Sequence, residues 1–214
     1  MLGEGAYPLS EAARYAGVPP ATVRSWFKVH SNGRPQGHVF KSDFPMVDGD
    51  YAVSFLNLIE IYVARFFRSA GVKPPTLRRT HEMMQVELNT THPFAHASLG
   101  TKGRSIIRQK GDASLVGVIS KQHFFGQMDL HKIKYAPATH LAEAWDIADG
   151  VTINPRISFG KPVIERTGIT TFVVANQFRA NGGDAKLVAR LFDLSESDVL
   201  HAARFEKGLD RRAA

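Results

Sequence analysis

A short stretch near the N-terminus combines an apolar helix face with side chains that could bind nucleic acid. From residue 21 to 28, the three- and four-residue spacing of Val23, Trp26 and Phe27 predicts a helix that buries one face. The basic side chains Arg24 and Lys28 fall on the other face. Such groups contact base edges and phosphates in protein–DNA complexes. We expect DNA contacts from this helix and the segment after it, through Thr22, Arg24, Ser25, Lys28, Arg34 and Lys41.

The residues before this helix predict the turn that would position it. A first helix from Ser10 to Ala16 could be capped by Ser10, and Gly17 suits the left-handed residue that ends such a helix. Pro19 and Pro20 suit the start of the second helix. Two short helices joined in this way are the pattern of a helix-turn-helix motif.

After the second helix, the sequence predicts a β wing. Asn32-Gly33 is a strong turn signal, and Gly37 to Lys41 alternates as a strand does. Residues 1–50 are therefore expected to form a winged helix-turn-helix domain. Helix pairs with a glycine turn also occur in many proteins that bind no DNA, so this pattern alone leaves DNA contact open.

The overall charge favours a polyanionic partner. The formal net charge is +7 and the isoelectric point is about 9.8, so nucleic acid is the first candidate and an acidic protein surface the second. The chain has no cysteine, which excludes thiol catalysis, disulfides and cysteine zinc fingers and fits a reducing compartment. The start of the chain lacks the pattern of a signal peptide, and the apolar stretch from Val53 to Phe67 is too short to span a bilayer. We expect a cytoplasmic protein without a membrane partner.

No common enzyme motif is present in the sequence. There is no phosphate-binding glycine loop, no Gly-x-Ser-x-Gly and no His-Glu-x-x-His. His92 and His96 are four residues apart, but Pro93 separates them and no acidic third ligand lies nearby in the sequence. The carboxylates are scattered, so no acid/base pair can be nominated. We expect no catalytic residue, no bound metal and no cofactor.

The central segment, residues 51–150, begins with a long apolar helix. Ser54 could cap a helix from Phe55 to Ser69, and Gly71 could end it. Apolar residues cover most of its circumference, so the helix belongs either to a core or to a subunit interface. We expect it to contribute to a homodimer, because such a helix is hard to bury in a small protein. A further helix is expected from about Thr76 to Leu88.

The rest of the central segment predicts a small antiparallel sheet. Ser105 to Arg108 and Leu115 to Ser120 are separated by Lys110-Gly111-Asp112, which suits a hairpin. Lys132 to Tyr135 could add another strand.

The last segment, residues 151–214, predicts a small helical domain. Short extended pieces at Val151 to Ile153 and Pro162 to Ile164 precede three helices, expected at Thr171 to Ala180, Ala185 to Leu191 and Glu196 to Glu206. Asp184 could cap the second helix, and Ser195 to Asp198 resembles a capping box before the third. This is a second helix-turn-helix candidate, and the whole chain is expected to have an α+β, mainly helical fold.

Several stretches resemble known families. The run from Ile153 to Ile164, followed by Thr167-Gly168-Ile169, resembles a small helical domain once catalogued only as a family of unknown function and now associated with antitoxins. Near the N-terminus, Tyr7 to Ala13 with Thr22 to Trp26 resembles the winged helix of MerR-type regulators. The middle of the chain, at Ser54 to Glu60 and His92 to Ala95, is similar to VapB-type antitoxins that carry both domains.

The resemblance implies an antitoxin that dimerises, binds its operator DNA and neutralises a PIN-like ribonuclease toxin. Toxins of this type hold magnesium in a carboxylate cluster that an arginine could occupy. In the tail predicted after the final helix, Arg211 or Arg212 is the candidate for this blocking group. The competing possibility is neutralisation through a folded surface, with Lys186, Arg190 and Arg204 as the basic candidates. The first alternative is a stand-alone transcription regulator of the MerR type. The second is a nucleic-acid-processing enzyme, which the lack of an acidic constellation disfavours.

Overall fold

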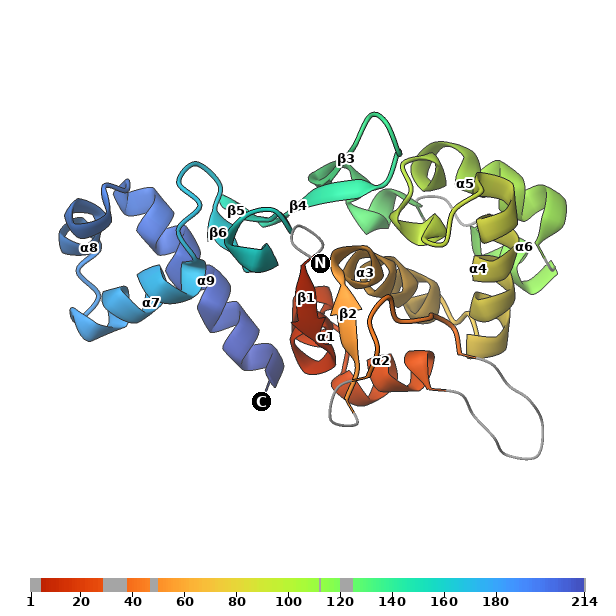
Figure 1. The fold of residues 1–214 in the computed structure, drawn as a ribbon, viewed down its shortest axis with the longest axis horizontal. Helices are drawn as coiled ribbons and strands as arrows, with labels where there is room; N and C mark the ends of the chain where they lie inside the picture. Colours follow the sequence, from red (N-terminus) through yellow and green to blue (C-terminus); the bar gives the residue numbers. More distant parts are fainter. Residues whose placement is uncertain (1–4, 29–37, 47–49, 112, 120–124, 214) are drawn as a thin grey trace. The chain divides into compact units, whose positions relative to one another are not determined.

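The computed structural model describes residues 5–28, 38–46, 50–111, 113–119 and 125–213 (Figure 1). The chain divides into two compact units: an N-terminal unit of residues 7–142, and a C-terminal unit of residues 143–214 together with residues 1–6. Helices dominate both units, which confirms the expected α+β, mainly helical fold. The finer division into three domains stays a prediction. Among the described residues, no helix combines the length and the apolar character needed to cross a membrane.

The N-terminal unit opens with the predicted pair of short helices, α1 (Leu9–Ala16) and α2 (Pro20–Phe27). Gly17 ends α1 in the left-handed conformation, with φ of 68°, and Pro20 takes the first position of α2. The predicted cap by Ser10 is wrong. The helix starts one residue earlier, because Leu9 is buried in the core and Pro8, which lacks a capping side chain, occupies the N-cap.

A two-stranded sheet accompanies these helices, formed by β1 (Ala6–Pro8) and β2 (Ala52–Ser54). The strand predicted at 37–41 is wrong over its described part, residues 38–41, where residues 39 and 40 form a bend and no strand is present. Val39 and Phe40 are both buried, and both of their N–H groups donate to the carbonyl oxygen of Trp26, at 2.7 and 3.0 Å. Two adjacent buried side chains break the alternation that a strand needs. The predicted wing turn, Asn32-Gly33, lies outside the described residues.

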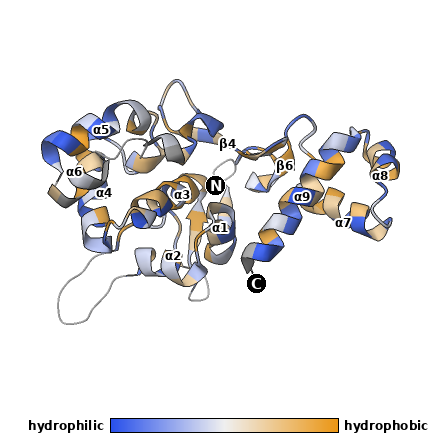
Figure 2. Ribbon diagram, turned by 180° about the vertical axis from the view of Figure 1, so that it is seen from behind, coloured by the Kyte–Doolittle hydropathy of each residue, from blue (hydrophilic) through white to orange (hydrophobic). Residues whose placement is uncertain are grey.

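The centre of the N-terminal unit is α3 (Phe55–Ser69). Ser54 caps it as predicted, accepting a hydrogen bond from the N–H of Asn57 at 3.1 Å. Figure 2 colours much of this helix as hydrophobic. It packs against α1, α4 (Pro74–Leu88) and the short 3-10 helix η1 (Pro93–Ala95), which bury it within a single chain. The argument that α3 needs a second subunit is therefore wrong, and the homodimer itself stays a prediction.

The predicted hairpin between residues 105 and 120 is wrong, because this region is helical. It forms α5 (Ser98–Lys110) and α6 (Ala113–Ile119). Leu99, Gly103 and Ile107 are buried at four-residue spacing, which is a helix period and not a strand period. Gly111 ends α5, where a Cβ atom would lie only 2.4 Å from the carbonyl oxygen of Ile107. Two 3-10 helices follow, η2 (Phe125–Met128) and η3 (Leu130–Lys132), and then the predicted strand, β3 (Ile133–Tyr135).

The C-terminal unit joins a small sheet to three helices. The strands β4 (Ala142–Ala148), β5 (Val151–Ile153) and β6 (Val163–Ile164) pair consecutively and antiparallel, with Thr152 opposite Val163. The 3-10 helix η4 (Ser158–Gly160) lies between β5 and β6. The helices are α7 (Thr171–Ala180), α8 (Ala185–Phe192) and α9 (Glu196–Ala213), close to the predicted ranges at their starts.

One hydrophobic core holds these three helices together. It contains Ile164, Val174, Val188, Ala189, Val199 and Ala202. Asp184 caps α8 as predicted, accepting a hydrogen bond from the N–H of Leu187 at 2.9 Å. Ser195 and Asp198 form the predicted reciprocal cap at the start of α9. The prediction of a tail beyond α9 is wrong, because the helix continues to Ala213.

Candidate functional site

The outer face of α2 presents the predicted DNA-binding side chains. Arg24 and Lys28 are exposed, and Ser25 is half-buried and donates a hydrogen bond to the carbonyl oxygen of Thr22 at 2.7 Å. Arg24 also pairs with Asp50, with 2.7 Å between Nη1 and Oδ1. About half of each side chain is exposed, at 47% and 60%, so the pair contributes little to stability and a phosphate could replace Asp50.

Lys41 lies on the segment that returns from α2 to α3. The hydrogen bonds from Val39 and Phe40 to Trp26 hold this segment against the end of α2. The carbonyl oxygen of Lys41 accepts a hydrogen bond from the side chain of Asn57 at 3.2 Å, and Asn57 is fully buried on α3. The side chain of Lys41 is exposed. The structure thus places Thr22, Arg24 and Ser25 on α2, Lys28 at its C-cap, and Lys41 on the segment held against the end of α2, while Arg34 lies outside the described residues.

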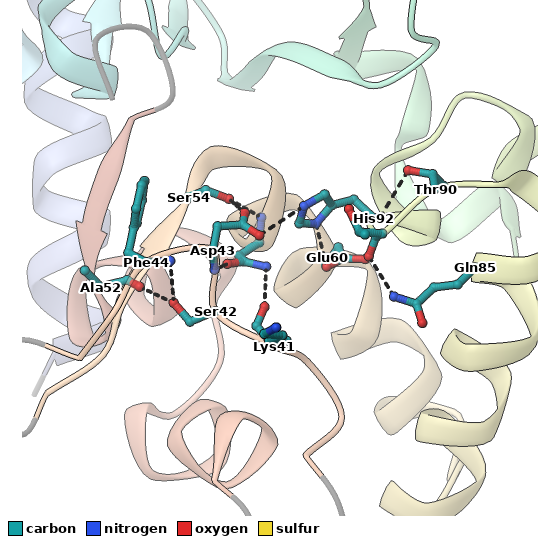
Figure 3. A network of polar contacts seen from close by, with 12 residues as sticks. Lys41, Ser42, Asp43, Phe44, Ala52, Ser54, Glu60, Gln85, Thr90 and His92 are labelled. Carbon is teal, nitrogen blue, oxygen red and sulfur yellow. Dashed lines mark hydrogen bonds and ion pairs between the residues drawn. The ribbon is translucent and has the colours of Figure 1, made fainter.

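A polar network that the sequence did not suggest fixes the same segment (Figure 3). The N–H of Asp43 donates to the Asn57 side chain at 3.2 Å, and its carboxylate accepts a hydrogen bond from the Ser54 hydroxyl. The other carboxylate oxygen of Asp43 lies 3.2 Å from Nε2 of His92. The segment after α2 is therefore held to the start of α3 and to η1 by charged and neutral hydrogen bonds.

Glu60 lies at the buried end of this network. Its exposed fraction is 1%, and its two oxygens contact Nε2 of His81 at 2.7 Å and Nδ1 of His92 at 3.2 Å. Burial alone would raise the pKa of Glu60, but the charges and hydrogen bonds of both histidines outweigh it and lower the pKa to about 2. Burial alone would lower the pKa of His92, but its bonds to Asp43 and Glu60 raise that pKa to about 10.

These pKa directions define what the network can do chemically. His92 is a cation with both ring nitrogens donating to carboxylates, so neither nitrogen is available as a base or a metal ligand near neutral pH. His96 does not join it, since its ring faces His140 with 5.8 Å between ring centroids. Over the described part of the chain, no three side chains of the metal-ligating types are grouped to hold an ion. The network therefore positions the segment that carries Lys41.

The fold brings to His92 two carboxylates that are not near it in the sequence. Asp43 and Glu60 both contact it, although 49 and 32 residues separate them from it in the sequence, a distance that spacing arguments do not bridge. The sequence contained one sign that Glu60 has a charged partner. Glu60 stands inside a helix that is apolar almost all round, and a buried carboxylate requires a cation or several donors.

The predicted toxin-binding residues lie on two helices of the C-terminal unit. Lys186 and Arg190 are exposed on α8. Arg204 and Arg211 are exposed on α9, and their seven-residue spacing puts them on one face. The backbone of Arg212 is helical, and its side chain lies outside the described residues. The four described side chains are thus distributed over the surfaces of α8 and α9.

Two hollows border α9, and Arg204 lines both of them. The first, of about 490 Å³, lies between α7 and α9. The second, of about 290 Å³, lies between α9 and the end of β4, and His201 and Phe205 also line it. Arg204 is the only one of the described toxin-binding candidates that lines either hollow.

Comparisons with known proteins match both units. Residues 151–205 match a family described as "Protein of unknown function (DUF433)". The chain is 25% identical over 201 residues to a Mycobacterium tuberculosis protein named "Putative antitoxin VapB45", covering 81% of this chain and 82% of that protein. The crystal structure of Rv2018 from Mycobacterium tuberculosis has the same fold, with a TM-score of 0.73 and 24% identity, and the match covers 92% of this chain and 95% of that one. The similarity to MerR-type regulators stays a prediction, but the comparisons confirm that the chain resembles VapB-type antitoxins.

Proposed function

We propose that the chain is an antitoxin that binds and neutralises a PIN-like ribonuclease toxin and represses its own operon by binding operator DNA. The observation that carries the proposal is a pair of exposed basic side chains, Arg24 on α2 and Lys28 at its C-cap, in a chain similar over four fifths of its length to a protein named as an antitoxin. That name also supports a role without catalysis.

The distribution of charge supports a division of the two proposed activities between the units. Acidic and basic residues are equal in number between residues 143 and 214, so the whole formal net charge of +7 comes from residues 1–142. Affinity for DNA depends on neutralising phosphates, which favours the N-terminal unit as the DNA-binding part. A balanced surface is better suited to a protein partner, so the C-terminal unit is assigned to the toxin.

The geometry of α2 supports a role as recognition helix. It is the second of two short helices joined at Gly17, and its buried face, with Val23, Trp26 and Phe27, fixes the orientation of the outer face. In DNA-binding motifs of this kind the second helix enters the major groove, while neighbouring segments rest on the backbone. Operators for such motifs have two-fold symmetry, so we also propose a homodimer, acting in the cytoplasm where operator and toxin are both present.

The proposed DNA binding is tested by measuring the affinity of the chain for the DNA segment upstream of its gene. Fluorescence anisotropy at several salt concentrations gives this affinity. Arg24→Ala should weaken binding by ~1 to 3 kcal/mol if Arg24 contacts a base edge. Lys28→Ala should reduce the slope of log affinity against log salt by about one if Lys28 contacts a phosphate. Lys186→Ala, which removes an exposed lysine of α8, is the control and should change neither. Unchanged affinity and slope in both α2 variants would exclude this face from the DNA contact.

The proposed toxin neutralisation is tested with the small protein encoded beside the gene. Purified together, the two should form a complex, and the chain should abolish ribonuclease activity of its partner at equal concentration. A chain that binds the upstream DNA but neither binds nor inhibits the neighbouring protein would be a stand-alone transcription regulator.

A further inference from the structure

The two helices α7 and α9 lie side by side (Figure 1). Their side chains leave an open groove between them. Its floor is apolar: Ala175 and Phe178 come from α7, and Leu200 and Ala203 from α9. The two alanines are small enough to leave room, and the groove measures about 490 Å³. Leu200 remains 39% exposed at its edge. A hollow of this size with an apolar floor can receive one or two apolar side chains of a partner.

The rim of the groove is charged, and its carboxylates are already engaged. Asp210 pairs with Arg179 at 3.5 Å. Glu206 is buried and accepts a hydrogen bond from the hydroxyl of Thr171. Among the described residues, neither Arg204 nor Lys207 has a carboxylate within ion-pair distance, and both are exposed. The rim therefore has a local positive charge, although the unit as a whole is balanced.

Arg204 stands between this groove and the second hollow, of about 290 Å³, on the other side of α9. A carboxylate that pairs with Arg204 would therefore place its neighbouring residues over a depression on either side. Neither Lys186 nor Arg190 on α8 lines either of these two hollows.

We propose that the groove between α7 and α9 is the docking site for the toxin, and that it takes a segment whose apolar side chain enters the groove while flanking carboxylates pair with Arg204 and Lys207. This inference rests on the proposed antitoxin function and specifies which surface carries it. An apolar anchor surrounded by complementary charges is the usual composition of the energetically dominant part of a protein interface.

The charged rim is tested by double charge reversal on the full-length chain. Arg204→Glu combined with Lys207→Glu should weaken binding to the toxin at least about a hundredfold, because like charges would then face each other. Lys186→Glu combined with Arg190→Glu changes the net charge by the same amount on α8 and should alter the dissociation constant less than about tenfold. Isothermal titration calorimetry with the protein encoded beside the gene gives both values, and the melting temperature of each variant checks that the C-terminal unit remains folded.

The apolar floor is tested by a matched pair of exposed leucines. Leu200→Ser should weaken toxin binding about tenfold or more, whereas Leu191→Ser on α8, where the leucine is 59% exposed, should leave it unchanged. Wild-type affinity in the Arg204→Glu/Lys207→Glu variant, or an equal loss in the α8 variants, would overturn the groove while leaving the antitoxin function intact. Failure of the wild-type chain to bind the neighbouring protein would overturn the proposed function, and the groove proposal with it.

Discussion

Replacing Glu60 by glutamine tests whether the buried ionic network holds the N-terminal unit together. Glutamine keeps the size and shape of the side chain but removes the charge that faces His81 and His92, at 2.7 and 3.2 Å. The variant leaves His92 with one carboxylate partner, Asp43, which is partly exposed. The perturbation is therefore electrostatic and leaves no cavity.

The structure sets the size of the expected effect. Lowering the pKa of Glu60 from 4.5 to about 2 corresponds to about 3 kcal/mol of preference for the ionised form in the folded protein. Removing one partner from a buried ion pair typically costs ~3 to 5 kcal/mol, which agrees in magnitude. We expect Glu60→Gln to lower the free energy of unfolding by about 3 kcal/mol near pH 6.

The effect should depend on pH in a defined direction. The pKa of Glu60 is lowered in the folded state, so its contribution is present above pH 4.5 and is lost as the pH falls toward 2. The pKa of His92 is raised, so its contribution is present below pH 6.5 and is lost as the pH rises through about 10. The difference between wild type and Glu60→Gln should be largest between about pH 4.5 and 6.5 and should narrow on both sides of that window.

Urea unfolding followed by the fluorescence of Trp26 measures this difference. A Trp145→Phe background removes the other tryptophan, which belongs to the C-terminal unit, so that the signal reports the N-terminal unit alone. Glu82→Gln is the control, because Glu82 is 61% exposed and only 3.9 Å from Arg78, and it should cost less than about 0.5 kcal/mol. A loss below about 1 kcal/mol for Glu60→Gln, or one that does not vary with pH, would refute the reasoning.

Ser54→Ala removes both the cap on the N–H of Asn57 and the hydrogen bond to Asp43. It should lower the free energy of unfolding by ~1 to 2 kcal/mol in the same urea assay. A change below about 0.3 kcal/mol would contradict this prediction. Gly150→Ala would place a Cβ atom 2.6 Å from Nδ1 of His201 at a φ of 69°, whereas Gly182→Ala meets the same backbone strain at φ of 65° in open space. The Gly150 variant should therefore lose ~1 to 3 kcal/mol more than the Gly182 variant in thermal unfolding, and equal losses would show that the close approach to His201 is relieved without cost. Ending the chain after Leu209 removes Arg211 and Arg212 but retains Arg204 and Lys207. We therefore expect the shortened chain to bind the toxin and the operator but to lose inhibition of the ribonuclease. Full inhibition by the shortened chain would exclude the terminal arginines as the blocking groups.

Elements whose determinants lie close together in the sequence could be predicted. The turn between α1 and α2 is determined by Gly17, Pro19 and Pro20, and the start of α8 by Asp184, so a few neighbouring residues are enough. The three helices of the C-terminal unit were predicted for the same reason. The end of α9 was placed too early, because Leu209, which is buried, continues the apolar face beyond Glu206.

Elements that depend on tertiary packing could not be predicted. The residues of α5 include two adjacent isoleucines, Ile106 and Ile107, which suit a strand as well as a helix. Only the packing of Leu99, Gly103 and Ile107 on one face settles the choice. The contacts of His92 with Asp43 and Glu60 are likewise a product of the fold. The locations of the candidate DNA-binding residues on α2 were predictable, whereas the groove between α7 and α9 required the structure.

The closed set of contacts among Asp43, Glu60, His81 and His92 also constrains how the sequence can change over evolution. Losing one of these residues leaves a buried charge without its partner, which is strongly destabilising. Exchanging the whole set for apolar residues of similar volume can leave the stability of the fold nearly unchanged. Homologous chains should therefore either retain an acid at position 60 with histidines at 81 and 92, or lack all three, and intermediates should be rare. Covariation at these positions in an alignment would then arise because the charges of residues distant in the sequence stabilise one another.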